Sequence, residues 1–171
     1  MHITECRAED IPLLDQCLPS GEATSFHARR FARQTAGTST YLVAWSDTHR
    51  PIGHTELRWT GCAAEEVRAA VLACPEINAL LVAEPLRGTG IGTTLIHHAE
   101  HLASQRSFRR IGLGVDPDGN PGAARLYTRL GYRPTVPYLD RWSYTDHDGT
   151  EHHQEDPCVF LVKSLGALRG V

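Results

Sequence analysis

The pattern of apolar and polar positions switches several times between a period of two and a period near 3.6, so strands are expected to alternate with helices. Apolar or alternating runs bounded by turn residues predict strands at His2–Cys6, Thr40–Trp45, Ile52–Trp59, Glu76–Ala83, Ile111–Val115, Tyr132–Asp140 and Cys158–Ser164. Apolar residues three and four positions apart predict helices at Ala8–Leu18, Glu22–Gln34, Thr94–Arg106 and Ala123–Leu130. Such a mixture is typical of an α/β fold.

The order of these elements predicts part of the topology. Ser46–Pro51 joins two β-rich runs and has the composition of a hairpin turn. The strand at Glu76–Ala83, the helix after it and the strand at Ile111–Val115 form a strand-helix-strand unit, which predicts one parallel pair. Ala63–Ala73 is either a helix or an excursion between strands. No repeat, low-complexity tract or linker divides the sequence, so one domain over residues 1–171 is expected.

Composition narrows the class of protein. With 171 residues, 41% of them hydrophobic, the chain is long enough for one well-buried core. The five cysteines are odd in number and form no close pairs, which argues against a disulfide framework and a zinc knuckle. No basic-then-apolar leader and no apolar stretch of about 20 residues is present, so a soluble, cytoplasmic protein without a membrane partner is expected. A net charge of −3 makes nucleic acid an unlikely partner.

A glycine-rich turn, Arg87-Gly88-Thr89-Gly90-Ile91-Gly92, lies between an apolar strand and a helix. Such a turn exposes backbone amides at the positive end of the helix dipole, which favours a phosphate, and Arg87 adds a permanent charge. The spacing is not the G-x-G-x-x-G of dinucleotide-binding proteins, and the Lys-Ser/Thr pair of triphosphate-binding loops is absent. From this turn alone, a tight connection and a phosphate site stay equally open.

A second motif follows at a distance. Asn120-Pro121-Gly122-Ala123-Ala124-Arg125-Leu126-Tyr127 and Leu130-Gly131-Tyr132 come after the glycine turn and its preceding Leu80-Leu81-Val82. In order and spacing, these segments resemble the GNAT-type N-acetyltransferases. The resemblance covers Ala79–Arg133, about a third of the chain. It implies a central, mostly antiparallel sheet of six to seven strands with one parallel, splayed pair and helices on both faces.

The resemblance also implies acetyl-CoA as co-substrate and no metal. Backbone amides from Gly88 to Gly92 would hold the pyrophosphate, and the pantetheine arm would hydrogen-bond along the strand before the turn. The residues expected to bind acetyl-CoA are Leu81, Val82, Ala83, Arg87, Gly88, Thr89, Gly90, Ile91, Gly92, Thr93 and Asn120.

Two residues are the candidates for catalysis. The family places the general acid that protonates the leaving thiolate at the position of Tyr127, although Leu126 and Leu130 make packing an alternative role for this ring. Many relatives carry a glutamate near Asn78, and an amide cannot accept a proton. The general base is therefore Glu76, a group from another segment, or a water relay.

Other polar groups are expected to have ordinary structural roles. His97, His98 and His101 predict a solvated helix face in preference to a metal site. Arg29, Arg30 and Arg33 also predict a solvated face. The acidic, histidine-rich stretch Asp146–Asp156 predicts an exposed hairpin loop, with attraction of a cationic acceptor as the alternative. No cysteine needs a covalent role, and Cys74 would be the first to test for one.

The sequence thus predicts an acyltransferase that moves an acetyl group from acetyl-CoA to an amine of a small molecule or peptide, directly and within a ternary complex. A non-catalytic acyl-CoA-binding module is one alternative, favoured by Asn78 and disfavoured by Tyr127. An acetyltransferase acting on a macromolecule, such as a protein N-terminus or an aminoacyl-tRNA, is another. A homodimer is compatible with the sequence, which leaves the acceptor undefined.

Overall fold

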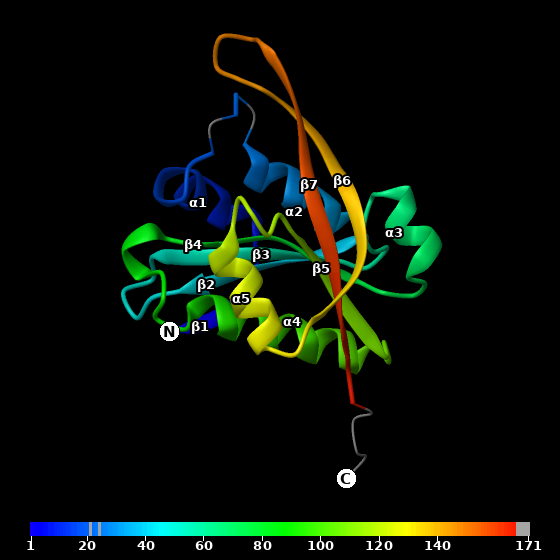
Figure 1. Cartoon of the computed structure of the whole chain (residues 1–171). Helices are drawn as coiled ribbons and strands as arrows, with labels where there is room; N and C mark the ends of the chain where they lie inside the picture. Colours follow the sequence, from blue (N-terminus) through cyan, green and yellow to red (C-terminus); the bar gives the residue numbers. More distant parts are fainter. Residues whose placement is uncertain (21, 24, 167–171) are drawn as a thin grey trace.

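The fold is built on a seven-stranded sheet with strands in the order β1-β2-β3-β4-β5-β7-β6, seen in the computed structural model of Figure 1. The structure describes residues 1–20, 22–23 and 25–166. The strands are β1 (His2–Glu5), β2 (Ser39–Trp45), β3 (Pro51–Arg58), β4 (Glu76–Val82), β5 (Arg110–Val115), β6 (Arg133–Thr145) and β7 (Glu151–Ser164). Neighbouring strands are antiparallel except for β4 and β5, which confirms the predicted parallel pair.

Helices cover both faces of the sheet, as predicted. The helices α1 and α2 lie on one face, and α4 and α5 lie on the other (Figure 1). Their bounds are α1 (Ile11–Cys17), α2 (Phe26–Thr35), α3 (Glu65–Ala70), α4 (Ile91–Gln105) and α5 (Pro121–Arg129), with single 3₁₀ turns at Ala8–Asp10 and Glu84–Leu86. None of the helices in the described ranges is long and apolar enough to cross a membrane.

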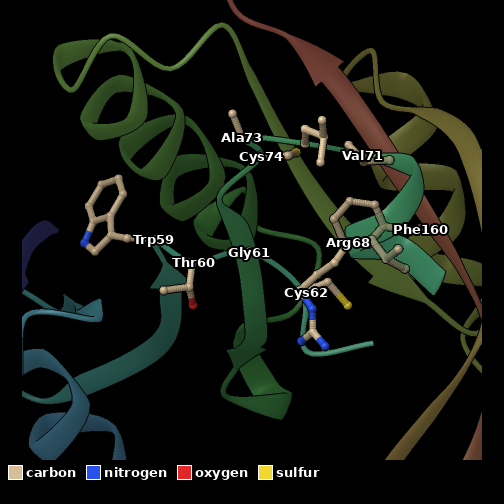
Figure 2. Close-up of a pocket in the computed structure, with 11 residues that line it drawn as sticks. Trp59, Thr60, Gly61, Cys62, Arg68, Val71, Ala73, Cys74 and Phe160 are labelled. Carbon is tan, nitrogen blue, oxygen red and sulfur yellow. The ribbon is translucent and has the colours of Figure 1, made fainter. Parts of the chain in front are cut away.

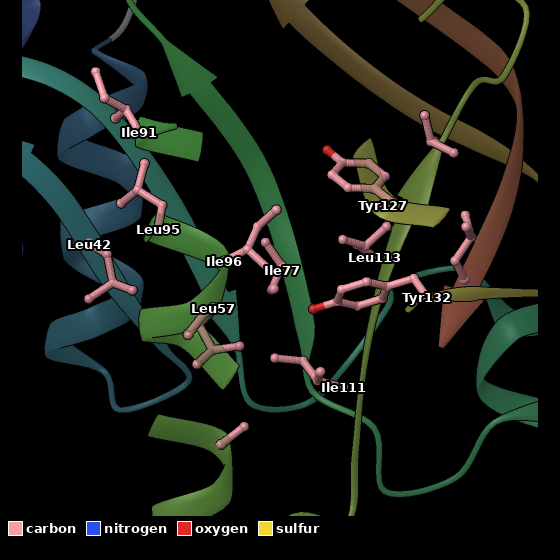
Figure 3. Close-up of a cluster of buried hydrophobic side chains, with 14 of the residues drawn as sticks. Leu42, Leu57, Ile77, Ile91, Leu95, Ile96, Ile111, Leu113, Tyr127 and Tyr132 are labelled. Carbon is pink, nitrogen blue, oxygen red and sulfur yellow. The ribbon is translucent and has the colours of Figure 1, made fainter. Parts of the chain in front are cut away.

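Alternation along β2 distributes its side chains to two hydrophobic clusters. Leu42 and Ala44 pack with Leu95 of α4 in the larger cluster, part of which Figure 3 shows. Tyr41 and Val43 face the α1 side. Because both faces are covered, every residue of β2 is buried.

The parallel pair separates soon after it begins. The register joins β4 to β5 only at Glu76 with Gly112 and at Ile77 with Leu113, whereas β4 stays paired with β3 as far as Val82. The β3–β4 register shifts at the point where Ala79 has a φ of 51°, in the left-handed region that a residue with a Cβ rarely adopts. The extra residue of this β-bulge bends its strand. The predicted splay is therefore present, and the bulge lies where β4 leaves β5.

Several predicted boundaries differ from the observed ones. The helix expected over Ala8–Leu18 is divided into a 3₁₀ turn and α1. The helix expected from Glu22 begins at Phe26, because Ser25 acts as the N-cap and its Oγ accepts a hydrogen bond from the backbone N–H of Ala28 at 3.0 Å. Ala63–Ala73 contains the short helix α3.

The stretch Asp146–Asp156 is not a loop over most of its length. Strands β6 and β7 extend to Thr145 and Glu151, so only the residues between these two form the turn. The prediction was wrong because residues 151–156 of β7 are polar on both faces, so no apolar alternation reveals this strand. The hairpin extends past the helices α1 and α2 (Figure 1), and Thr145 accepts a hydrogen bond from the backbone N–H of Ala23 at 2.9 Å.

The arginines of α2 are only partly a solvated face. Arg29 contacts Glu22, but Arg33 reaches the fully buried Glu56 of β3 with two hydrogen bonds of 2.6 and 2.7 Å. Arg30 lies 3.7 Å from the same carboxylate. Burial alone would raise the pKa of Glu56, but the hydrogen bonds from Arg33 and the surrounding charges lower it. The predicted solvated face is wrong for Arg30 and Arg33 because their guanidinium groups lie against the carboxylate of Glu56, which is 23 residues from Arg33 in sequence.

Candidate active site

A cleft of about 400 Å³ opens where β4 and β5 separate. Its walls come from β4, from the end of β5 and the loop after it, from α5, and from the β6–β7 hairpin. The lining residues are Glu76, Ile77, Asn78, Ala79, Leu80, Gly114, Val115, Asp116, Gly119, Asn120, Ala123, Tyr127, Tyr138, Asp140, Asp156 and Cys158. The cleft thus combines the predicted acid, Tyr127, with the predicted base, Glu76, which are far apart in sequence.

The glycine turn has a conformation suited to an anion. Gly88 and Gly90 have φ values of 79° and 95°, which residues with side chains rarely adopt, and a Cβ at either position would meet open space. Gly90 is the N-cap of α4, whose first residue is Ile91, three positions before the start expected at Thr94. The amides of Ile91, Gly92 and Thr93 therefore belong to the first turn of the helix, where N–H groups lack intrahelical acceptors.

Two side chains of the turn are held by its own backbone. Arg87 is exposed and its Nε donates to the carbonyl oxygen of Val82 at 3.3 Å. Thr89 Oγ1 donates to the carbonyl oxygen of Leu86 at 2.6 Å. The Ile91 side chain is 7% exposed and packs in the core, so Ile91 can offer a ligand only its backbone.

The end of β4 has one paired and one unpaired edge. On the paired edge, the N–H of Ala83 donates to the carbonyl of Ile52 at 2.9 Å, and Leu81 and Val82 are in register with β3. On the opposite edge, the register with β5 ends at Ile77. Backbone groups of β4 beyond Ile77 can therefore pair with an extended ligand in place of a strand.

Asn120 and Tyr127 come from the helix on the far wall. Asn120 is the N-cap of α5, and its Oδ1 accepts from the N–H of Ala123 at 3.1 Å, so the Nδ2 group is the remaining donor of this side chain. The Tyr127 ring packs in the larger cluster near Tyr132, with ring centroids 6.3 Å apart, and its hydroxyl points toward β4 (Figure 3). Burial raises the pKa of Tyr127 to about 12.

Glu76 and Asp140 form the acidic part of the cleft. Glu76 is 2% exposed, and its Oε2 lies 3.4 Å from Nη1 of Arg58. Burial raises the pKa of Glu76, Arg58 opposes this effect, and the charge of Asp140 adds to it. The pKa of Asp140 is also raised, mainly by burial. A carboxyl group with a raised pKa is a better proton acceptor when ionised.

A second hollow, of about 240 Å³, lies beneath α3 and is shown in Figure 2. Its lining includes Trp59, Arg68 and Phe160, but neither Tyr127 nor any residue of the glycine turn. Cys62 and Cys74 also line it, and burial raises the pKa of each thiol to about 12. Because the thiolate is the nucleophilic form, this environment argues against a covalent role for Cys74.

The histidines of α4 are not gathered around a metal site. His97 is exposed and its Nδ1 lies 3.1 Å from Oε2 of Glu100. Glu100 also receives hydrogen bonds from Lys163 and Tyr132, so its carboxylate is fully engaged in joining α4 to the sheet. Within residues 1–20, 22–23 and 25–166, no group of three or more His, Cys, Asp or Glu residues could hold a metal ion.

Comparison with known proteins decides the family. Residues 11–132, well over half of the chain, match the model of the Acetyltransferase (GNAT) family. The chain belongs to the GNAT family. Its activity is therefore acetyl-CoA-dependent N-acetyl transfer, and the sheet with one splayed parallel pair is the GNAT fold.

Solved structures agree with this fold. A ribosomal-protein-alanine N-acetyltransferase from Brucella melitensis is 20% identical, with a TM-score of 0.67 over 96% of this chain and 100% of that chain. A phosphinothricin acetyltransferase from Sinorhizobium meliloti, in complex with AcCoA, is 18% identical, with a TM-score of 0.66 over 96% and 88%. An aminoglycoside 6'-N-acetyltransferase complexed with coenzyme A is 16% identical, with a TM-score of 0.62 over 97% and 98%. No curated protein matches the sequence of this GNAT chain.

Sequence reasoning missed part of the acceptor side of this GNAT site. Asp140, Asp156 and Tyr138 line the cleft, and none was a predicted site residue. Asp140 was placed at the end of a strand and Asp156 in a loop. Two-residue alternation through Tyr138, Asp140, Trp142 and Tyr144 was the signal that could have extended the strand and grouped these residues on one face.

Proposed function

We propose that this GNAT enzyme transfers the acetyl group directly to an amine, with Tyr127 as general acid and Glu76 as general base. The observation that carries the proposal is the cleft at the β4–β5 splay, because it is lined by both residues and lies beside the open edge of β4. No protein nucleophile is needed. The amine nitrogen bonds to the thioester carbon, the carbon–sulfur bond breaks, one amine proton passes to Glu76, and the sulfur receives the Tyr127 proton.

The donor is held mainly by the backbone. The pyrophosphate of acetyl-CoA lies against the amides from Gly88 to Thr93, at the positive end of the α4 dipole. Arg87 supplies a positive charge at the mouth of this site. The pantetheine arm pairs with β4 at Leu81 and Val82, and Asn120 Nδ2 donates to it from the facing wall. An amide at the bulge polarises the thioester carbonyl.

The raised pKa of Tyr127 is compatible with its proposed role. A phenol with a pKa of about 12 is neutral at any physiological pH and can donate its proton. A thiolate in water, with a parent pKa near 8.5, would be too weak a base to take it. Burial also raises the pKa of a thiol, as at Cys74, which reaches about 12. The proposed proton transfer therefore requires that the cleft also desolvate the leaving sulfur and raise its proton affinity.

Glu76 has the position and environment of the base. It lies on the same cleft wall as Asn78. Its pKa is raised, so it is closer to the pKa of an amine than the pKa of an exposed glutamate is. Asp140 lines the same cleft and strengthens the negative potential that attracts a protonated amine.

Thiol release from acetyl-CoA with a panel of amines tests the proposal. Release by the wild-type protein, and its loss in Tyr127→Phe with CoA binding retained, supports direct transfer with this acid. A protein that is thermally stabilised by CoA but releases no thiol with any amine would be an acyl-CoA-binding module. Normal turnover by Tyr127→Phe would remove Tyr127 from the mechanism.

We also propose a cytoplasmic location for the enzyme. All five cysteines lie within the described residues and none is bonded to another, which suits a reducing compartment. A homodimer remains a prediction.

A further inference from the structure

One face of the β6–β7 hairpin continues the wall of the cleft away from the core. The register pairs Asp140 with Asp156, Trp142 with Gln154, and Tyr144 with His152. Side chains alternate between the two faces of a strand, so these six residues share a face with Tyr138 and Cys158, which line the cleft. Along β7, the even-numbered residues on this face are more buried than the odd-numbered residues between them.

The inner end of this face carries more negative charge than its surroundings balance. Asp140 and Asp156 are direct cross-strand partners, an arrangement in which like charges repel. In the described part of the chain, Arg58 pairs with Glu56 at 3.5 Å and with Glu76 at 3.4 Å, and Arg141 pairs with Glu155 at 2.8 Å. None of these ion pairs uses Asp140 or Asp156, although burial raises the pKa of Asp140 and the charge of Arg58 opposes this effect. Among the described residues, the lining of the cleft thus holds four carboxylates, those of Glu76, Asp116, Asp140 and Asp156, and no arginine.

An independent feature of the same cleft points to a ligand beside these carboxylates. Tyr127 is 8% exposed, and its hydroxyl has no hydrogen-bond partner among residues 1–20, 22–23 and 25–166, although it lines the same cleft as Asp140 and Asp156. A buried phenol normally has a partner. A substrate in this cleft can supply that partner, because Tyr127 lines the same cavity as Asp140 and Asp156.

An aromatic surface follows the acidic pair along the hairpin. Trp142 is 45% exposed, and its Nε1 donates to Oδ2 of Asp156 at 2.9 Å, which fixes the indole beside the carboxylates. The rings of Trp142 and Tyr144 are stacked with centroids 5.5 Å apart, and Tyr144 stacks on His152 at 4.8 Å. An indole face beside carboxylates favours an organic cation.

We infer that the acceptor carries a second positive charge, bound by Asp140 and Asp156 beside the Trp142 ring, while its reacting amine lies between Glu76 and Tyr127. This inference rests on the proposed function of the cleft. The chemistry required is an ammonium group a few bonds away from the reacting amine. From Tyr138 to Tyr144 an extended strand spans about 20 Å, enough for a linear diamine or for the first residues of a basic peptide.

Two matched pairs of acceptors test this inference and separate its sources. The free-amine pair is 1,4-diaminobutane against butylamine, and the peptide pair is Ala-Lys-Ala against Ala-Gln-Ala, so each pair differs by one positive charge. The kcat/KM of each acceptor is measured for the wild type, Asp140→Asn, Asp156→Asn and Glu151→Gln. Glu151 is the control, because it lies on the opposite face of the hairpin and is exposed.

In the wild type, the kcat/KM of the member with the additional positive charge should be about tenfold higher in at least one pair. Asp140→Asn and Asp156→Asn should remove that preference, because the doubly charged member loses more than the singly charged member, and Glu151→Gln should retain it. The pair that shows the preference identifies the source. Equal kcat/KM within both pairs, or an equal loss for both members in Asp140→Asn, would overturn the inference.

A binding measurement keeps this test independent of the chemistry. Calorimetric titration of each acceptor into the complex with CoA should give tighter binding of the charged member in the wild type and equal binding in Asp140→Asn. If no amine is acetylated but this preference is seen, the proposed function fails and the cation site stands. If amines are acetylated without the preference, the cation site fails and the proposed function stands.

Discussion

The proposed donor and acceptor halves of the active site are built in different ways. The proposed donor half consists mainly of backbone amides from one continuous segment, the glycine turn and the first turn of α4, whose residues are not part of the lining of the cleft. The acceptor half consists of side chains from β4, β6 and β7, including Glu76, Asp140 and Asp156. Backbone groups that bind phosphate constrain the sequence through a few glycines, whereas side chains can be exchanged without altering the fold. This difference explains how one fold can keep the same acetyl donor while its acceptor changes.

The largest expected effect comes from the residue between the two halves. Tyr127→Phe removes the proton donor and retains the ring that packs in the core. Turnover should fall by about 100-fold or more, in the range for loss of a general acid, and the Kd for CoA should change little. Thiol release and calorimetric titration of CoA measure the two effects. A large loss of CoA affinity would instead assign Tyr127 to the donor half.

Glu76→Gln tests the acceptor half through pH. In the wild type, the raised pKa of Glu76 should appear as an acidic limb, because kcat/KM falls as pH drops through this pKa and the base becomes protonated. The variant should lose about 10- to 100-fold in activity and should lose this limb. The control is Glu65→Gln, an exposed carboxylate on α3, which should leave the profile unchanged. An unchanged limb in Glu76→Gln would assign it to another group.

Gly90→Ala tests the donor half through the backbone. At a φ of 95°, a Cβ strains the residue by about 1–2 kcal/mol, although no atom lies in its way. The Kd for CoA should therefore rise by about tenfold, and the melting temperature should fall by a few degrees. Gly122→Ala is the matched control, because its φ is not positive and it lies on α5. Equal CoA affinity in Gly90→Ala and the wild type would show that the turn does not hold the pyrophosphate.

The smallest expected effect is that of Arg87→Ala. An exposed guanidinium gains little from a phosphate beyond what the backbone already supplies, so the Kd for CoA should rise about fivefold with kcat unchanged. The effect should diminish at high salt, since exposed charges are screened. A decrease in kcat at saturating acetyl-CoA would contradict the separation of the two halves.

The prediction of the donor half depends on local information in the sequence. Each of its two motifs consists of one turn and one helix start, namely Arg87–Gly92 and Asn120–Tyr127. The spacing of residues within each motif can be recognised without knowledge of the rest of the fold. The strand order around the parallel pair followed from the same unit. The one shift was the start of α4, which begins inside the turn at Ile91.

The acceptor half was less predictable because its contacts are distant in sequence. Asp140 and Asp156 meet only through the hairpin register, and residues 151–156 of β7 are all polar, so they carry no apolar pattern that reveals this register. The hydrogen bond from Arg33 to Glu56 is likewise a contact between residues 23 positions apart in sequence, which no local pattern predicts. The bulge at Ala79 has no local signal, since alanine is a poor residue for a positive φ and is held there by pairing with β3.

A crystal structure of the enzyme with CoA tests the division of the active site into a donor half and an acceptor half most directly. The pyrophosphate should lie on the amides from Gly88 to Thr93, with the pantetheine against β4. The sulfur should lie within about 3.5 Å of the Tyr127 hydroxyl, on the side of the cleft that faces Glu76. A CoA bound in the hollow beneath α3, or one whose sulfur points away from Tyr127, would contradict this account.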